Sequence, residues 1–380
     1  MGQDGAGAVV TTLSLEADPR EPEPIEPLVG GTGAVRVRRA LLVGGVPVGA
    51  VVAALVIGGV LIAREGSNPL AVYGDVLHGV FVANRGLSNT AVAATPLIFM
   101  GLGLAIAYRA RLFTIGAEGQ FVLGAVAAVA FATAGGVRGL PTWLLVPACI
   151  IVAAAAGLVW SSISAILGNR FNTSIVISSL LLTYVATAIM QWVIRVGIKD
   201  PDSFVPASRV IGEAALPTVP GIGVHLGFVV AVALVPIAWV LVSRSRFGFR
   251  VDVIGHNPIA LRANEVSTGR MLVIVLASVG ALSGIAGYVQ VAGVTNRINA
   301  EFSVGYGFTA IIVALLGRLH PVGVLVAALG LSGLTIGFDM AEREHQLPST
   351  LVGVVQALII IFVVVGDAIV ARSAPPEERA

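Results

Sequence analysis

Long apolar runs alternate with short polar segments along most of this chain. A run of about 20 apolar residues is long enough for a helix to cross the hydrocarbon core of a bilayer. The pattern therefore predicts an all-α polytopic membrane protein with about ten transmembrane helices. The predicted spans are Ala40–Ala63, Asn89–Tyr108, Phe113–Ala134, Leu144–Leu167, Thr173–Val193, His225–Val242, Met271–Gly293, Gly305–Gly317, Val322–Gly337 and Ser349–Val370.

Three segments depart from the plain pattern of full-length spans. Gly305–Gly317 and Val322–Gly337 are shorter than a bilayer crossing requires, so we expect broken or tilted helices there. Pro69–Ala83 is mildly amphipathic and predicts an interfacial helix after the first span. The pairs Gly280-x-x-x-Gly284 and Gly333-x-x-x-Gly337 predict close helix packing within the bundle.

Composition agrees with lipid as the main solvent of residues 37–372. Charged residues make up 12% of the chain and the mean hydropathy is +0.94, whereas soluble domains hold about 25% charged residues. Residues 1–36 are acidic and proline-rich, which predicts a disordered tail, and residues 373–380 form a second tail. The basic residues form no stripe that would indicate nucleic-acid binding.

The distribution of arginine predicts the orientation in the membrane. The segments that this topology places inside hold more arginines than those outside, among them the basic loop Ser243–Arg270. Both termini are then cytoplasmic. The first span follows a basic segment and is too long for the apolar core of a cleaved signal peptide. We therefore expect a multi-pass membrane protein with the loop 243–270 on its cytoplasmic face.

The chain offers little to an enzyme interpretation. It has no G-x-x-x-x-G-K-[ST] loop for nucleotide phosphates, no catalytic set and no metal-ligand spacing, and Cys149 is its single cysteine. No cofactor or metal is expected in this chain. Transport fits better, driven by an ion gradient or by a separate ATPase. Glu118 is the one acid well inside a span, and we favour a role at its own helix N-terminus over one in substrate binding.

A faint internal echo links Phe113–Ala130 with Ala314–Gly330. Both contain a glycine-rich polar turn followed by a helix of small residues. Broken helices at corresponding places in two halves indicate a transport path, although chance explains one such pair equally well.

Five motifs in order resemble a known family: LFTIGAEGQFVLGA, ISSLLLTYVA, RVDVIGHNPIALRA, GALSGIAGYVQVAG and YGFTAIIVALLGRLHPVG. Over Asn68–Gly366 the chain resembles the permease subunits of bacterial ABC importers of the simple-sugar and nucleoside class, nucleoside permeases above all. It departs from the family at Thr114 and Thr183, where asparagine is usual, and at Asn264-Glu265-Val266. These departures bear on the substrate rather than on the class.

The resemblance implies a type II ABC importer-like permease with two inverted halves. It implies a second permease subunit, either the same or a different chain, ATPase subunits that hold ATP and Mg, and an extracytoplasmic substrate-binding lipoprotein. The implied substrate is a nucleoside, with a simple sugar or another small polar solute as the alternative. A stand-alone ion-coupled carrier or channel is the alternative from another class.

The resemblance also implies a short coupling helix at about Asn257–Val266 that docks on the ATPase. Pro258 would lie in its first turn, where a missing N–H costs nothing, after Gly255 as a hinge. Without the resemblance, an ordinary arginine-rich loop explains this segment equally well. The residues assigned to coupling are Gly255, Asn257, Pro258, Ala260, Arg262 and Ala263.

A path for a nucleoside needs neutral polar groups and an aromatic face, because the solute must leave again. The candidates within the spans are Glu118, Gln120, Thr183, Tyr184, Gln290 and Gln356. Each has a structural alternative, since polar groups often bond across a bundle for ~0.6 kcal/mol. Tyr184 and Gln356 are favoured because both fall near mid-membrane, where the two halves are expected to meet.

Overall fold

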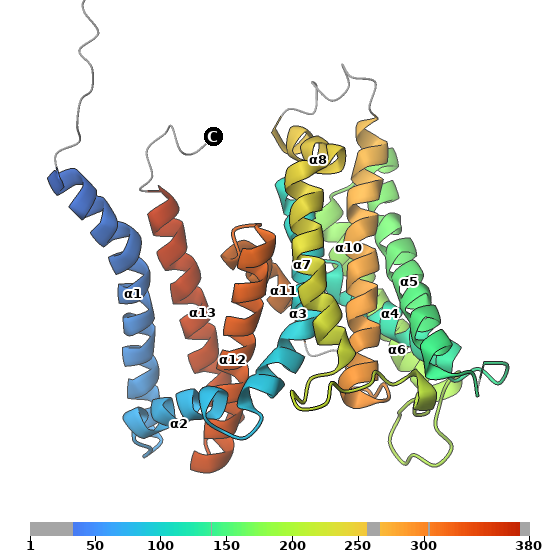
Figure 1. The fold of residues 1–380 in the computed structure, drawn as a ribbon, viewed down its shortest axis with the longest axis horizontal. Coiled ribbons are helices and arrows are strands. Elements are labelled where there is room, and N and C mark those ends of the chain that lie inside the picture. The colour runs from blue at the N-terminus through green and yellow to red at the C-terminus, as the bar shows by residue number, and fades with distance from the viewer. Residues whose placement is uncertain (1–32, 138, 257–266, 303–304, 373–380) are drawn as a thin grey trace, which may run out of the picture.

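The structure of the protein is a computed structural model that describes residues 33–137, 139–256, 267–302 and 305–372 (Figure 1). Within these ranges helices dominate, and the only pairing of extended backbone is in isolated bridges such as Ala207 with Asn299. The predicted all-α class is confirmed. The two terminal tails lie outside the described residues, apart from the first helical residues at 33–36.

The elements follow the apolar runs in order. They are α1 (Gly33–Arg64), α2 (Pro69–Phe81), α3 (Gly86–Arg109), α4 (Ala117–Ala132), α5 (Thr142–Phe171), α6 (Ile175–Val196), the 3-10 turn η1 (Gly212–Ala214), α7 (Leu226–Arg244), α8 (Arg246–His256), α10 (Thr268–Gln290), the π-helical turn η2 (Val291–Thr295), α11 (Tyr306–Leu316), α12 (Pro321–His345) and α13 (Ser349–Arg372).

Seven of the described helices are long and apolar enough to cross a membrane. The described part of α1 and α2 form an eighth candidate, bent by 115° between them, and α4 and α11 are shorter apolar helices. The protein is therefore a polytopic helical membrane protein, but the expected count of about ten full spans is not confirmed. In Figure 1, α8 marks one end of the bundle and α2 lies across the opposite end; we call these the α8 end and the α2 end.

A central bundle of α3, α4, α5 and α10 holds the main core. The apolar window of α3 is 89% buried, because α7, α10, α11 and α12 all pack on it. Gly157, Gly280 and Gly284 let α5 and α10 cross with their backbones in contact: a β-carbon on any of them would overlap a backbone atom of the other helix. This confirms the predicted close packing at Gly280-x-x-x-Gly284.

A flanking group lies to one side, formed by α1, α2, α13 and the end of α12. In Figure 1, α1 and α13 run side by side, and α2 passes below them. Its separate cluster of buried residues includes Val76, Phe338 and Val355. The predicted interfacial helix is α2, which begins at Pro69 after Asn68 accepts a hydrogen bond from the amide of Leu70 at 3.0 Å.

Three sequence-based expectations were wrong in detail. The run Phe113–Ala134 is not one helix, because residues 113–116 are not helical and lead into the 16-residue α4. The run Val322–Gly337 is not short, since α12 has 25 residues. The basic loop is not all loop either: it opens with α8, whose Val251 and Ile254 are buried on one face.

The echo between Phe113–Ala130 and Ala314–Gly330 does not mark equivalent elements. The first segment leads into a short helix, whereas the second contains the end of α11 and the start of the full-length α12. The better match to α3 followed by short α4 is α10 followed by short α11.

Candidate functional site

Glu118 joins the two short helices in the middle of the molecule. It lies in the first turn of α4 as expected, and its side chain is buried. One carboxylate oxygen accepts from the amide of Gly305 at 3.1 Å, and the other accepts from the amide of Gly307. These amides belong to the N-terminus of α11, whose partial positive charge favours a carboxylate. Glu118 therefore caps a helix of the other half of the chain.

The two short helices also meet through aromatic rings. Phe121 of α4 stacks on Phe302 with ring centres 5.2 Å apart, and lies 5.6 Å from Tyr306 in the first turn of α11. Gly307 permits this approach, because a β-carbon there would overlap the backbone of Glu118.

The sequence carries a signal for this junction in two similar tetrapeptides. The tetrapeptide F-T-I-G ends at Gly116, the residue before α4, and F-S-V-G ends at Gly305, the residue before α11. Residues 303 and 304 lie outside the described ranges, so the likeness there is one of sequence. A search for short repeats that end in glycine would have paired the two helices.

Three other candidates for the path lie near these helices. Gln120 is buried, and its Oε1 has no hydrogen-bond partner among the described residues. Gln290 of α10 donates to the hydroxyl of Tyr306 at 3.3 Å. Thr183 of α6 donates to the carbonyl of Ser179 in its own helix at 3.1 Å and is buried beside Gly119.

Tyr184 and Gln356 are placed differently. Tyr184 follows Thr183 on α6 but turns away from the core, with 68% of its surface exposed. Gln356 lies near the middle of α13 and is half-buried. The structure therefore does not bring all six candidates together: four surround the short helices, and two lie on separate helices.

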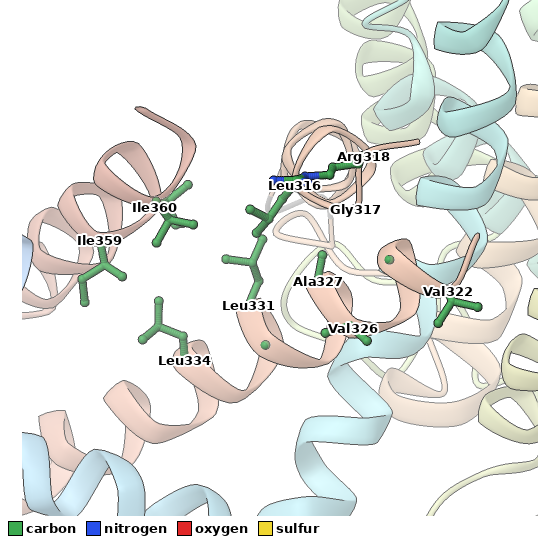
Figure 2. A pocket seen from close by; sticks show the side chains of 13 residues that line it. Leu316, Gly317, Arg318, Val322, Val326, Ala327, Leu331, Leu334, Ile359 and Ile360 are labelled. Carbon is green, nitrogen blue, oxygen red and sulfur yellow. The ribbon is translucent and has the colours of Figure 1, made fainter. Parts of the chain in front are cut away.

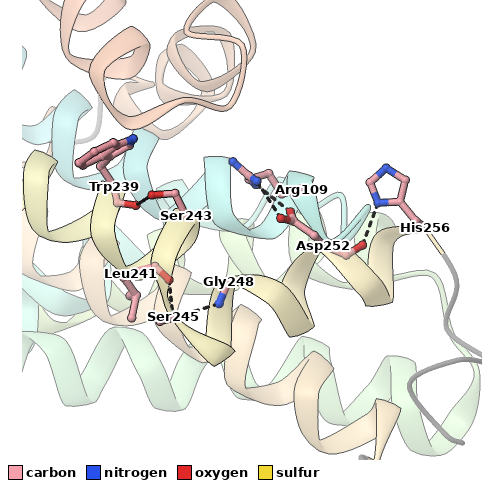
Figure 3. A network of polar contacts seen from close by, with 8 residues as sticks. All are labelled: Arg109, Trp239, Leu241, Ser243, Ser245, Gly248, Asp252 and His256. Atoms are coloured by element: carbon pink, nitrogen blue, oxygen red, sulfur yellow. Dashed lines mark hydrogen bonds and ion pairs between the residues drawn. The ribbon is translucent and has the colours of Figure 1, made fainter. Parts of the chain in front are cut away.

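The α8 end has its own polar network (Figure 3). The hydroxyl of Ser245 accepts from the amides of Phe247 and Gly248 at 3.1 and 3.2 Å, which satisfies donors that the first turn of α8 would otherwise leave free. Further along, Arg109 at the end of α3 forms two parallel hydrogen bonds with Asp252, each 2.9 Å long. The start and the middle of α8 are both fixed.

Of the residues assigned to coupling, only one lies within the described ranges. Gly255 lies in the last turn of α8 and is buried. Asn257, Pro258, Ala260, Arg262 and Ala263 lie outside the described residues, so their predicted helix stays a prediction.

Two pockets among the described residues differ in how well their linings suit a nucleoside. A cavity of about 530 Å³ opens between α11, α12 and α13 (Figure 2). Its walls are apolar, with Leu331, Leu334 and Ile359 among them, and Arg318 is the one charged residue in its lining. A polar pocket of about 400 Å³ lies at the α2 end, lined in part by Asn84, Asn89, Asp339 and Arg343. A solute with several hydroxyls needs more polar partners than the apolar cavity offers.

Two short helices that start within the bundle, with facing N-termini, are typical of membrane transport proteins. The comparisons define the class further. The family described as "Branched-chain amino acid transport system / permease component" matches residues 86–364. The chain belongs to this family and is a permease component of an ABC transporter, which confirms the resemblance stated above.

Several relatives match most of the chain. A glucose ABC transporter permease protein of Haloferax volcanii is 34% identical over 93% of this chain and 92% of its own length. A guanosine ABC transporter permease protein of Bacillus subtilis is 33% identical over 77% of this chain and 84% of its own. A nucleoside ABC transporter permease protein of Lactococcus lactis is 28% identical, over 80% and 86%. No solved structure matches the chain.

Proposed function

We propose that this chain is the permease subunit of an ABC importer that passes nucleosides inward by alternating access. The observation that supports it most is the similarity to permeases named for guanosine and nucleosides, over most of both chains. The chain has no phosphate-binding loop of its own, so ATP and Mg would be bound by a separate ATPase subunit.

The α8 end is the proposed cytoplasmic face. It holds the basic loop, and α1 begins and α13 ends toward the same side in Figure 1, in keeping with cytoplasmic termini. The ATPase would dock on residues 257–266, next to α8. The substrate-binding lipoprotein would meet the opposite end, where the long α6–α7 connection lies against residues that follow α10: the amide of Ser208 donates to Ile298 at 2.8 Å.

The proposed path runs along Tyr184 and Gln356 rather than through the centre of this chain. Glu118, Gln290 and Thr183 already bond within the chain. The side chain of Tyr184 is exposed on α6, where a neighbouring subunit could contact it. In chain order, α6 is the second helix after α4, and α13 is the second helix after α11. A second permease, a further copy or a different chain, would complete the path.

The substrate is tested with the reconstituted complex. Uptake of labelled guanosine should be saturable, need ATP, and be inhibited by unlabelled nucleosides but not by glucose. A simple sugar is the second candidate, favoured by the similarity to a glucose permease over 93% of the chain. Inhibition by glucose and not by nucleosides would replace the first candidate with the second.

The energy source is tested in the same assay. Uptake that survives ATP depletion and collapses with an uncoupler would point to an ion-coupled carrier.

The path is tested by Tyr184→Ala and Gln356→Ala, with Val185→Ala as the control. Val185 is the next residue on α6 and is also exposed. Each of the first two variants should change uptake rate or substrate ranking while the control does not. Unchanged uptake in both, with normal amounts of complex, would place the path elsewhere.

Docking of the ATPase is tested at the predicted coupling helix. Pro258→Asp together with Ala260→Asp should abolish transport while the chain still folds in the membrane. Normal uptake by this double variant would contradict the role of residues 257–266.

A further inference from the structure

The end of α3 is held against α8 by one paired contact. Nε and Nη2 of Arg109 each donate to a different oxygen of Asp252 at 2.9 Å, as Figure 3 shows. Two parallel bonds between planar groups fix direction as well as distance. The side chains remain 28% and 37% exposed, and ion pairs in such partly solvated places add little to stability. The pair is therefore better suited to setting the position of α8 than to holding the fold together.

A backbone contact reinforces this pair. Gly255, one turn beyond Asp252, lies so close to Arg109 and Ala110 that a β-carbon would overlap the carbonyl oxygen of Arg109. The imidazole Nδ1 of His256 lies 2.8 Å from the carbonyl of Asp252 in the preceding turn. The last turn of α8 is thus attached to the residues where α3 ends.

A continuous set of contacts leads from this attachment to the short helices. The hydroxyl of Tyr108 donates to the carbonyl of Thr114 at 2.9 Å, which fixes the connection after α3. The amide of Ile115 donates to the hydroxyl of Ser179 on α6 at 3.1 Å. Three residues further on, Glu118 receives the amides at the start of α11. A displacement of α8 would therefore reach the N-terminus of α11 through ten residues of chain, Arg109–Glu118.

We propose that Arg109 and Asp252 are a positioning pair that transmits movement of α8 to the paired starts of α4 and α11. The pair touches neither solute nor ATP. It acts by making the α3–α4 connection move with α8, so that an event at the α8 end changes the middle of the membrane domain. This inference rests on the proposed function, in which the ATPase acts at the segment that follows α8.

The test measures solute transported per ATP hydrolysed, in proteoliposomes that hold the complete complex. Arg109→Gln and Asp252→Asn should each lower this ratio by about tenfold, within the range that substitutions along a coupling route produce. The ATPase should remain bound, and ATP hydrolysis should continue. The double variant should be no worse than either single one, because each already removes the same interaction.

Exchange of the two charges supplies a rescue. Arg109→Asp combined with Asp252→Arg should recover part of the ratio that each of these changes alone destroys. Arg250→Gln is the matched control, because Arg250 is an exposed arginine of the same helix. It should leave the ratio within about twofold of the natural protein, since exposed charges contribute little.

Two results would overturn the inference. One is an unchanged ratio in both single variants, and the other is failure of both to assemble, which would make the pair an element of folding. A different result would count against the proposed function instead: no ATPase bound to the natural protein, and no ATP-dependent transport by it.

Discussion

The central bundle and the flanking group are both made of apolar helices, but their helices pack in different ways. In the central bundle, backbone meets backbone where glycines of α5 and α10 cross. In the flanking group side chains make contacts such as the edge-on pair of Tyr73 and Phe338, with ring centres 6.5 Å apart, and one backbone approach is added where Gly337 of α12 meets the carbonyl of Val76. The apolar window of α3 is 89% buried, whereas that of α13 is 22% buried.

The difference shows which region can adjust. Backbone contacts leave no side chain to rearrange, because the interior is packed at the density of a crystal and cannot deform gradually. The flanking group borders the cavity of about 530 Å³ between α11, α12 and α13, and its contacts can change by side-chain rotation. We interpret the central bundle as a fixed frame and the flanking group as the more adaptable part.

The largest expected effect comes from placing a side chain at the central crossing. Gly284→Val would force a β-carbon into the carbonyl of Ala153. Overpacking of this kind costs about 1–3 kcal/mol or more, and here both backbones resist. We expect little folded protein, measured by size-exclusion chromatography of the detergent-solubilised chain.

The control for this variant lies in the flanking group. A β-carbon at Gly353 of α13 meets nothing within 4 Å, so Gly353→Val should give a normal yield. Equal yields from the two glycine variants would remove the distinction between the regions.

Glu118→Ala tests the junction of the two short helices. It removes a charged acceptor from two amides of α11, and hydrogen bonds to charged groups contribute about 1.5–3 kcal/mol each. We expect a loss of about 3 kcal/mol in thermal unfolding, the low end of the range for two such bonds. Glu118→Gln keeps one oxygen acceptor and should lose less stability than Glu118→Ala. A greater loss of stability in Glu118→Gln would contradict the capping role.

A smaller effect is expected from the ion pair of the flanking group. Nε2 of His345 lies 2.7 Å from Asp75, and the two side chains are 22% and 33% exposed. Asp75→Ala should therefore cost at most about 1 kcal/mol. If Asp75→Ala lost as much stability as Glu118→Ala in the same unfolding assay, polar contacts would contribute equally to stability in the flanking group and in the centre.

The smallest effect is expected at the apolar cavity. Gly330 lies within α12 and lines this cavity, and a β-carbon there meets no neighbour within 4 Å. Gly330→Ala should raise stability by about 0.5 kcal/mol, because glycine inside a helix costs conformational entropy. A decrease would show that another surface covers Gly330.

Much of the fold could be predicted because the bilayer imposes it. Runs of apolar residues must be helical where no water can satisfy the backbone, and α3, α5, α6, α7, α10 and α13 fall within a few residues of their predicted bounds. The late start of α4 was missed because the apolar run was read as one span, although the glycine-rich polar turn in Phe113–Ala130 indicated a break. The helix α8 was predictable from the sequence, because Phe247, Val251 and Ile254 have helical spacing.

The candidate site was harder to predict for a physical reason. A single sequence shows that Glu118 is an unusual acid in an apolar run, but its amide donors are 187 and 189 residues away. Similarly, Thr183 and Tyr184 are neighbours in sequence, yet one is buried and the other exposed. Only the rotation of α6 against α4 decides which of the two can meet a solute.

The long separation between Glu118 and its donors has a consequence for biosynthesis. Ribosomes add roughly 5–20 residues per second, so Gly305 and Gly307 would be made on the order of 10–40 s after Glu118. During that interval α4 exists without the helix that it caps. The first half of the nascent protein is therefore in the membrane before its partner is made, and a chain truncated before Gly305 would leave the carboxylate of Glu118 without these two amides.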